Sequence, residues 1–132
     1  MIVLDASAMV AMLVGAGLVA ERIREKVEAP DESLHVPHVM ELEVLHALRR
    51  HALLGSLSRE RSSEALTDLG NISFVRYPHT PLIGRIWELK ENLTAYDAAY
   101  VALAEALDAP LITMDARLAQ APGIRAAVEV YG

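Results

Sequence analysis

Short apolar runs that end in an aspartate occur near both ends of the chain. The run "IVL" at residues 2–4 leads into "DAS", and the run "PLITM" at residues 110–114 leads into "DARLA". A few consecutive apolar residues followed by a residue that caps helices are typical of a buried strand that passes into a helix. Both runs therefore predict strands, with Asp5 and Asp115 at their carboxyl ends.

Between these runs the apolar positions recur mostly with helical spacing. The predicted helices lie at about 17–28, 39–54, 58–69, 80–90 and 92–107. Two further strands are predicted, at "ISFVRY" (72–77) and "AAVEV" (126–130). Strands that alternate with helices predict an α/β fold with a central, mainly parallel sheet, in which ligands bind at the carboxyl ends of the strands.

The composition favours one domain that has more apolar surface than its core needs. The chain has 132 residues, 53% hydrophobic and 23% charged, and no stretch rich in proline, glycine or serine marks a boundary. We expect one domain over residues 1–132, with enough apolar surface for association. Trp87, Tyr96 and Tyr100 suit either the core or an interface, and the core is the first expectation for them.

The N-terminal apolar stretch fits neither a signal peptide nor a membrane span, because Asp5 and two glycines interrupt it and no basic run precedes it. No association with a membrane is expected. The chain has no cysteine, which excludes disulfides and thiolate metal sites and agrees with a cytoplasmic location.

The formal net charge of −6 provides no general attraction to a polyanion. A nucleic-acid ligand would therefore need a metal ion or local cations. The basic residues near the candidate segments are Arg49, Arg50, Arg85, Lys90 and Arg117. A solvated helix face explains most such charges, and we retain Arg117 because it lies two residues beyond Asp115.

Three aspartates stand at predicted helix starts, where capping explains each one separately. Asp5 and Asp115 suit N-caps, and Thr94 with Asp97 has the spacing of a capping box. Together, however, two aspartates at strand ends and one in a first helical turn can face one crevice. Clustered carboxylates repel unless a cation neutralises them, and Mg²⁺ or Mn²⁺ is the usual occupant of an all-oxygen site. A metal site explains the three aspartates together, whereas capping explains them only one at a time.

A fourth carboxylate comes from the helix at 39–54, which offers two candidates. Glu41 and Glu43 project about 200° apart, so only one can join the aspartates. A helical wheel places Glu41 on the apolar face and Glu43 away from it. That apolar face is defined by Val44, Leu45, Leu48 and Ala52. Periodicity therefore does not select Glu43, and both residues also suit a first helical turn as partners of the helix dipole.

Four segments in their order resemble PIN-domain ribonucleases, and most closely VapC-type toxins of bacterial toxin–antitoxin pairs. They are "IVLDASAMV", "VPHVMELEVLHALRR", "LTAYDAAYVALAEAL" and "PLITMDARLA", and they extend over essentially the whole chain. The resemblance implies a PIN-like three-layer fold, with residues 1–132 as a single PIN domain. It assigns the acidic cluster to Asp5, Glu43, Asp97 and Asp115. Glu43 is preferred because "EVLHAL" matches the family's E-V-x-x-A-L.

The activity that this resemblance implies is a Mg²⁺- or Mn²⁺-dependent endoribonuclease, which hydrolyses RNA phosphodiester bonds with a metal-activated water. Asp5 and Asp97 are expected as direct ligands. Glu43 and Asp115 are expected to bind through water, to hold a second ion or to orient the nucleophile. Ser7, Thr113 and Arg117 are candidate substrate-binding residues, although capping and strand packing explain the two hydroxyls equally well. Two departures from many relatives are His46, where asparagine is common, and Met114.

The resemblance also implies partners, namely RNA as the substrate, a VapB-type antitoxin that lies across the active-site groove, and a second copy of the chain in a homodimer. The main alternative is a catalytically inactive PIN-like module that binds protein or RNA, which would lose the acids that this chain retains. A receiver-like domain needs a lysine at the end of a late strand, and neither "PLITM" nor "AAVEV" contains one. A haloacid-dehalogenase-like phosphatase has a second aspartate where this chain reads "DAS".

Overall fold

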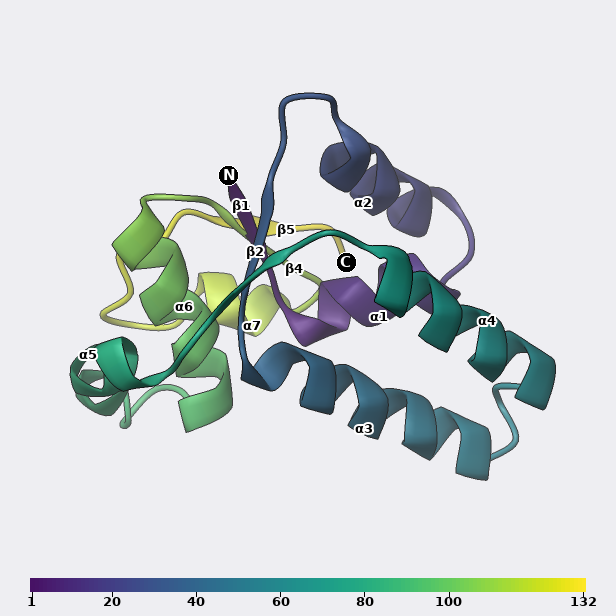
Figure 1. Ribbon diagram of the computed structural model, residues 1–132. Helices are drawn as coiled ribbons and strands as arrows, with labels where there is room; N and C mark the ends of the chain where they lie inside the picture. Colours follow the sequence, from purple (N-terminus) through teal and green to yellow (C-terminus); the bar gives the residue numbers. More distant parts are fainter.

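A five-stranded sheet lies at the centre of the computed structural model, which describes residues 1–132 (Figure 1). The strands are β1 (Ile2–Leu4), β2 (Leu34–Pro37), β3 (Val75–Tyr77), β4 (Leu111–Thr113) and β5 (Val128–Val130). Their order is β3-β2-β1-β4-β5, and every neighbouring pair is parallel. The predicted α/β fold is confirmed, with a sheet that is wholly rather than mainly parallel.

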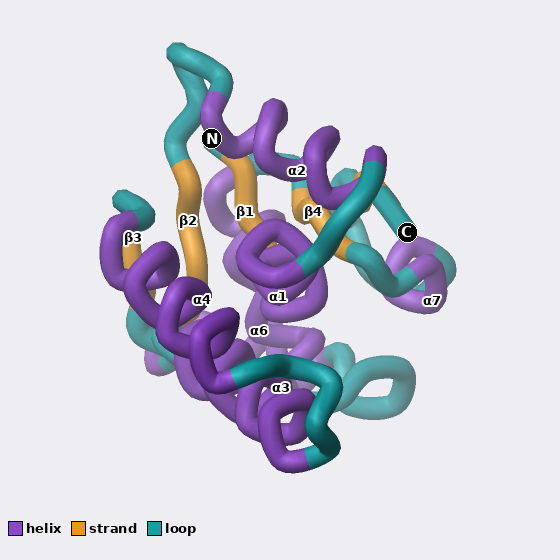
Figure 2. Tube along the Cα trace, turned by 90° about the vertical axis from the view of Figure 1, so that its right-hand side faces the viewer, coloured by secondary structure: helices purple, strands orange, loops and turns teal.

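Helices connect the strands and cover both faces of the sheet. They are α1 (Ala6–Val14), α2 (Leu18–Glu28), α3 (Val39–Leu53), α4 (Arg59–Asn71), α5 (Ile83–Glu88), α6 (Ala95–Leu107) and α7 (Ala116–Ala119). Because crossovers between parallel strands are right-handed, the helices between β1 and β3 lie on one face and those on the return to β4 lie on the other. In Figure 2, α1 lies in front of the strands with α3 and α4 beside it, and α6 packs against β1, β2 and β4.

The core is centred on β1, β4 and helix α6. Every residue of β1 and β4 is buried, as expected for parallel strands covered on both faces. Residues 98–104 of α6 are also buried in one unbroken run. Four of these seven are alanines, so the helix backbone can lie close to the sheet.

The strand β2 was not predicted, because "LHVP" contains a histidine and a proline. His35 is buried in β2, and both of its ring nitrogens are hydrogen-bonded, to the Ser33 hydroxyl at 2.8 Å and to the Tyr77 hydroxyl at 2.7 Å. A buried polar side chain is tolerated when such partners satisfy it. These partners lie in the preceding loop and in β3, so local hydrophobicity gave no sign of the strand.

Other elements differ from the prediction mainly in length and exposure. The strand expected at 72–77 is limited to Val75–Tyr77, and the helix expected at 80–90 is a 3₁₀ turn at Thr80–Leu82 followed by α5. Trp87 and Tyr96 are 67% and 59% exposed, so the expected core location is wrong for both. Trp87 lies on α5, a short helix with no buried residue. Tyr100 is buried, as expected. No individual helix has both the length and the hydrophobicity needed to cross a membrane.

The strand order reverses beside β1, and this reversal positions the candidate site. From β1 the chain moves outward through β2 to β3, then returns to place β4 on the other side of β1. In open α/β sheets, ligands bind outside the carboxyl ends of the strands at such a switch point. Asp5 directly follows β1, and Asp115 lies two residues after the end of β4.

Candidate active site

Asp5 is a buried carboxylate that three donors orient. It is the N-cap of α1, and its Oδ1 accepts hydrogen bonds from the Ala8 backbone N–H at 2.9 Å and from the Ser7 hydroxyl at 2.6 Å. Its Oδ2 accepts a hydrogen bond from the Thr113 hydroxyl at 2.5 Å. Capping therefore uses Oδ1, whereas Oδ2 keeps acceptor capacity for a further ligand.

The hydroxyls of Ser7 and Thr113 connect the turn after β1 to the turn after β4. Besides donating to Asp5, the Ser7 hydroxyl accepts from the Met114 N–H at 3.0 Å. The Thr113 hydroxyl accepts from the Asp115 N–H at 3.0 Å. The two segments are thus fastened to each other through the side chains that orient Asp5, and both hydroxyls lie at the candidate site.

Helix α6 positions Asp97 directly and Glu43 indirectly. The Thr94 side chain accepts from the Asp97 N–H at 3.1 Å and caps the helix, as the capping-box spacing predicted. One turn later, the hydroxyl of the buried Tyr100 donates to Glu43 Oε1 at 2.7 Å. Sequence reasoning missed this function of Tyr100. The available signal was its i, i+3 spacing from Asp97, which places both side chains on one side of the helix.

The two glutamates of α3 face different partners, in the way that the family motif implied and that the helical wheel did not. Glu43 faces Tyr100 and the aspartates, whereas Glu41 forms a bidentate ion pair with Arg76 near β3, at 2.6 and 3.2 Å. The wheel was misleading because Leu45 and Ala52 are exposed. The buried face of α3 is instead formed by Met40, Val44 and Leu48, and the two glutamates lie on opposite flanks of it.

Asp115 caps α7 and is engaged by Arg117. Its Oδ1 accepts from the Arg117 backbone N–H at 3.0 Å and from Nε at 3.1 Å, and its Oδ2 accepts from Nη2 at 2.9 Å. The Arg117 side chain is otherwise 90% exposed. An exposed ion pair of this kind is weak, so the guanidinium can leave Asp115 at little cost.

The four carboxylates influence each other's ionisation. Burial, opposed by its hydrogen bonds, raises the pKa of Asp5, and the charge of Asp97 adds to the rise. Burial also raises the pKa of Glu43, with contributions from the charges of Asp97 and Asp5. The pKa of Asp97 is raised by burial and by the charge of Asp115, whereas Arg117 lowers the pKa of Asp115. Mutual repulsion of this kind is typical of functional sites.

The carboxylate oxygens of these four residues suit a hard divalent cation. In this structure, however, the four carboxylates do not converge on one point. All four side chains offer oxygen, and the charge coupling runs between Asp5, Asp97 and Glu43 and from Asp97 to Asp115. No three acidic or histidine side chains enclose a common position. Each carboxylate is instead turned toward protein donors, most visibly Asp115 toward Arg117. A cation between the coupled carboxylates would remove the repulsion that raises their pKa values.

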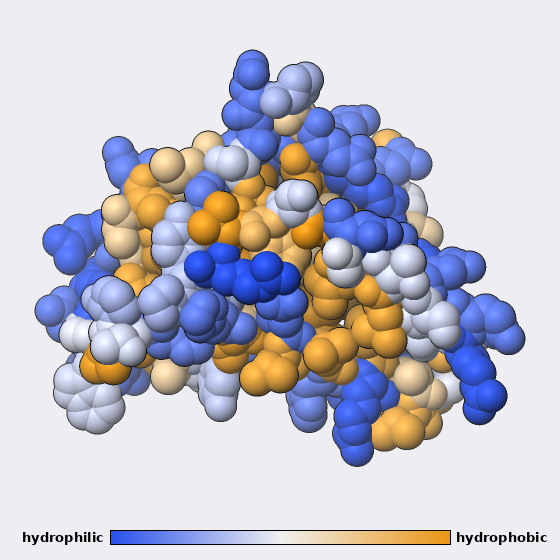
Figure 3. Space-filling model, in the orientation of Figure 1, coloured by the Kyte–Doolittle hydropathy of each residue, from blue (hydrophilic) through white to orange (hydrophobic).

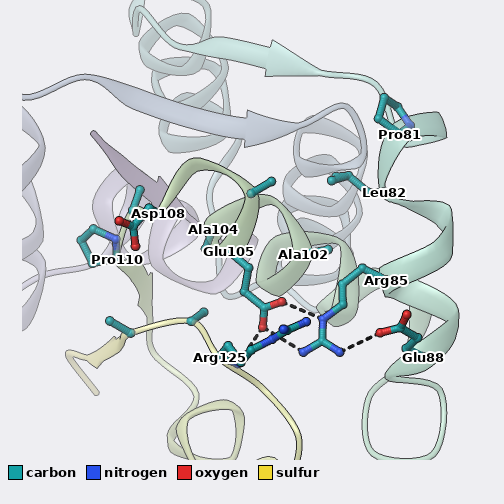
Figure 4. A pocket seen from close by; sticks show the side chains of 14 residues that line it. Pro81, Leu82, Arg85, Glu88, Ala102, Ala104, Glu105, Asp108, Pro110 and Arg125 are labelled. Atoms are coloured by element: carbon teal, nitrogen blue, oxygen red, sulfur yellow. Dashed lines mark hydrogen bonds and ion pairs between the residues drawn. The ribbon is translucent and has the colours of Figure 1, made fainter.

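One of the candidate cations, Arg85, lies far from these acids. Arg85 donates to Glu105 at 2.7 and 3.1 Å, to Glu88 at 3.1 Å and to the Gly123 carbonyl at 2.7 Å. This network borders a cavity of about 680 Å³ near the amino ends of β4 and β5, the opposite edge of the sheet from the acids (Figure 4). Lys90 lies over the Trp87 ring, 5.1 Å from its centroid. Arg117 is the candidate cation in contact with a site carboxylate.

Comparison with known proteins places this geometry in a family. Residues 2–124 match the PIN domain family. Ribonuclease VapC1 of Mycobacterium tuberculosis is 48% identical over 124 residues, which cover 92% of this chain and 91% of the relative.

Solved structures show the same fold at low sequence identity. The crystal structure of PAE2754 from Pyrobaculum aerophilum has a TM-score of 0.71 at 24% identity, covering 97% of this chain and 82% of that one. The crystal structure of VapBC2 from Rickettsia felis, bound to a DNA fragment from their promoter, has a TM-score of 0.71 at 14% identity and covers all of both chains.

Proposed function

Because the chain belongs to the PIN-domain family and within it to the VapC ribonucleases, we propose that Asp5, Glu43, Asp97 and Asp115 form the active site of a metal-dependent endoribonuclease. The protein is then the toxin of a type II toxin–antitoxin system, with residues 1–132 as one PIN domain. PIN-domain ribonucleases are generally metal-dependent, and we assign Mg²⁺ or Mn²⁺ to this site.

Within this proposal each acid has a defined task. Asp5 and Asp97 hold the cation directly, because Asp5 Oδ2 keeps acceptor capacity and the two charges are coupled. Glu43, oriented by Tyr100, and Asp115, released from Arg117, bind through water or orient the attacking water. A bound Mg²⁺ or Mn²⁺ supplies Lewis-acid stabilisation of the phosphoryl oxygens and lowers the pKa of water. We assign substrate contacts to Ser7 and Arg117, whereas Thr113 is fully buried and acts by orienting Asp5.

The observation that carries this proposal is the charge coupling among the acids. Burial, together with the charge of a neighbouring carboxylate, raises the pKa values of Asp5, Glu43 and Asp97, which come from the end of β1, from α3 and from α6. Asp5 and Glu43 form no ion pair with a basic residue, and Arg117 offsets the repulsion at Asp97 only in part. A divalent cation and a phosphodiester suit that arrangement.

The experiment compares cleavage of RNA by the wild type and by Asp97→Asn, with Mg²⁺, with Mn²⁺ and with EDTA. We expect metal-dependent cleavage that Asp97→Asn lowers by at least about a hundredfold. Asp108→Asn is the matched control. Asp108 ends the same helix, is exposed and has a left-handed backbone that asparagine tolerates. Undiminished cleavage by Asp97→Asn, or in EDTA, contradicts the assignment.

The alternative of an inactive binding module is distinguished in the same assay. Such a module would bind RNA or protein with either metal but would leave the RNA intact. Retention of all four acids at the switch point favours the enzyme.

The partners of the protein follow from its family. As a VapC toxin it has RNA as its substrate and a cognate VapB-type antitoxin as its partner. We propose that the antitoxin lies across the active-site groove and that the protein acts in the cytoplasm. We also propose a homodimer, because the side chains of Ile83 and Trp87 project from one face of α5 and are 59% and 67% exposed. Trp87→Ser should shift sedimentation from dimer to monomer, whereas Leu66→Ser, an exposed apolar position on α4, should not.

A further inference from the structure

A groove of about 800 Å³ extends from the carboxylate cluster along helix α3. Ser7 and Glu43 line its end next to the acids, and Arg50 and His51 line it near the end of α3. Arg50 lies seven positions after Glu43 on the helix, roughly 10 Å along the axis. The groove therefore connects the proposed reaction centre to cationic side chains on its flank.

The cationic end of the groove contains an arginine with no competing partner. Arg50 is exposed and forms no ion pair. His46, one turn earlier, lines the same groove. Arg49 is equally exposed and unpaired but does not line the groove. Of the two neighbouring arginines, only Arg50 can reach a ligand that also touches the acids.

Tyr96 provides an aromatic wall beside the acids. It lies in the first turn of α6, next to Asp97, lines the groove and is 59% exposed. Its hydroxyl has no hydrogen-bond partner in the protein. An exposed tyrosine on a site wall offers a ring face to a planar ligand, and bases of single strands stack on such rings.

The rest of the groove surface is mostly apolar. Val10 and Ala6 contribute from α1, and Leu42 and Val39 from α3. Hydrophobic side chains are visible over the region of α1 and α3, with hydrophilic side chains around them (Figure 3). An apolar floor with a cation at one end and a tyrosine at the other suits a ligand that alternates planar bases with phosphates.

We propose that this groove binds the segment of single-stranded RNA next to the scissile phosphate. Arg50 binds a phosphate of a neighbouring nucleotide, and Tyr96 stacks on a base. The inference rests on the proposed ribonuclease function, and it names residues that position the substrate and do not take part in the bond cleavage. RNA is favoured over a peptide because one end of the groove is lined by Glu43 and by Ser7, which bonds Asp5, and because Arg50 is far enough away to bind a second phosphate.

The first experiment measures RNA cleavage by Arg50→Gln and by the matched control Arg49→Gln, over a range of salt concentrations. Arg50→Gln should raise KM for a mixed-sequence single-stranded RNA several-fold with kcat nearly unchanged. It should also lower the slope of log KM against log salt by about 0.7, the loss of one phosphate contact to a single strand. Arg49→Gln should change neither quantity. Hydrolysis of bis(p-nitrophenyl) phosphate, which does not extend into the groove, should be the same for both variants and the wild type.

The second experiment separates stacking from simple occupation of space. Tyr96→Ala should weaken RNA binding at least about fivefold, measured by fluorescence anisotropy in the Asp97→Asn background, and Tyr96→Phe should restore it. The inference is overturned if wild-type RNA cleavage is intact while Arg50→Gln leaves KM unchanged and Tyr96→Ala leaves RNA binding unchanged, which would indicate that the groove binds a protein segment instead. Failure of the proposed function gives a different result, because the wild type then cleaves neither RNA nor the small diester.

Discussion

Thr113 on β4 donates a hydrogen bond to the carboxylate of Asp5 at the end of β1, so one buried side chain fixes the orientation of another from the adjacent strand. The same hydroxyl accepts from the Asp115 N–H at 3.0 Å. A single threonine thus sets the relation between two of the acids. Groups that orient metal ligands in this way influence metal affinity and activity strongly.

Thr113→Val keeps the shape of the side chain and removes its hydroxyl. The Asp5 carboxylate then loses one of its hydrogen bonds while it stays buried, which raises its pKa further and lets it rotate. We expect a loss of about tenfold to a hundredfold in cleavage and in Mn²⁺ affinity, and a decrease of about 1–3 kcal/mol in the free energy of unfolding. Thr113→Ser retains the hydroxyl and should retain most of the activity. Full activity in Thr113→Val would show that the hydroxyl is dispensable.

Glu43→Gln should stabilise the metal-free protein while it abolishes cleavage. The folded protein binds a proton at Glu43 more tightly than the unfolded chain does, because the pKa of Glu43 is raised from 4.5. Ionised Glu43 therefore lowers the free energy of unfolding. This effect grows as the pH rises from about 4.5 through the folded pKa, and it is fully present above the folded pKa. Glutamine can still accept the Tyr100 hydrogen bond. We expect a melting temperature in EDTA at neutral pH that is higher by on the order of a few degrees, a difference that disappears below the unfolded pKa.

Glu41→Gln is the matched control for that substitution. Arg76 lowers the pKa of Glu41, so this carboxylate stabilises the fold above its unfolded pKa and loses that contribution as the pH falls through the folded value. Its replacement should lower the melting temperature slightly at neutral pH and leave cleavage intact. Equal destabilisation by both substitutions would contradict the assignment of repulsion to Glu43.

Arg117→Gln should increase the affinity for Mn²⁺ although it removes a cation from the substrate site. In the proposed site Arg117 and a metal ion would compete for the Asp115 carboxylate, and the guanidinium lowers the pKa of that group. Without it, the pKa of Asp115 returns toward its usual value. Calorimetric titration should show Mn²⁺ bound a few-fold more tightly, while KM for RNA rises. Arg59→Gln, an exposed arginine on α4 without an ion pair, should change neither.

The parts of the site that the sequence predicted are those whose position depends on nearby residues. Asp5 and Asp115 follow apolar strands, and Asp97 follows its capping threonine by three positions, so local pattern was sufficient to locate them. Glu43 was different, because its direction depends on how α3 is rolled against the sheet. The exposed Leu45 and Ala52 concealed that orientation, and only the family motif selected the glutamate whose charge is coupled to Asp5 and Asp97.

Features that depend on distant partners were not predictable from local pattern. The strand β2 is stabilised by the partners of His35, one of which is Tyr77, 42 residues away. Tyr100 meets Glu43 across 57 residues. The exposure of Trp87 likewise reflects a helix that packs weakly on the core.

The position of β4 beside β1 also determines when the protein becomes active during its synthesis. Asp5 leaves the ribosome first, but its partner Thr113 is 108 residues further along the chain, and the turn with Asp115 follows it. A nascent chain therefore contains an incomplete, unoriented set of acids until its last strands have been translated and paired with β1. A chain that terminates before β4 lacks Thr113 and Asp115, and its Asp5 lacks the hydrogen bond that orients Oδ2.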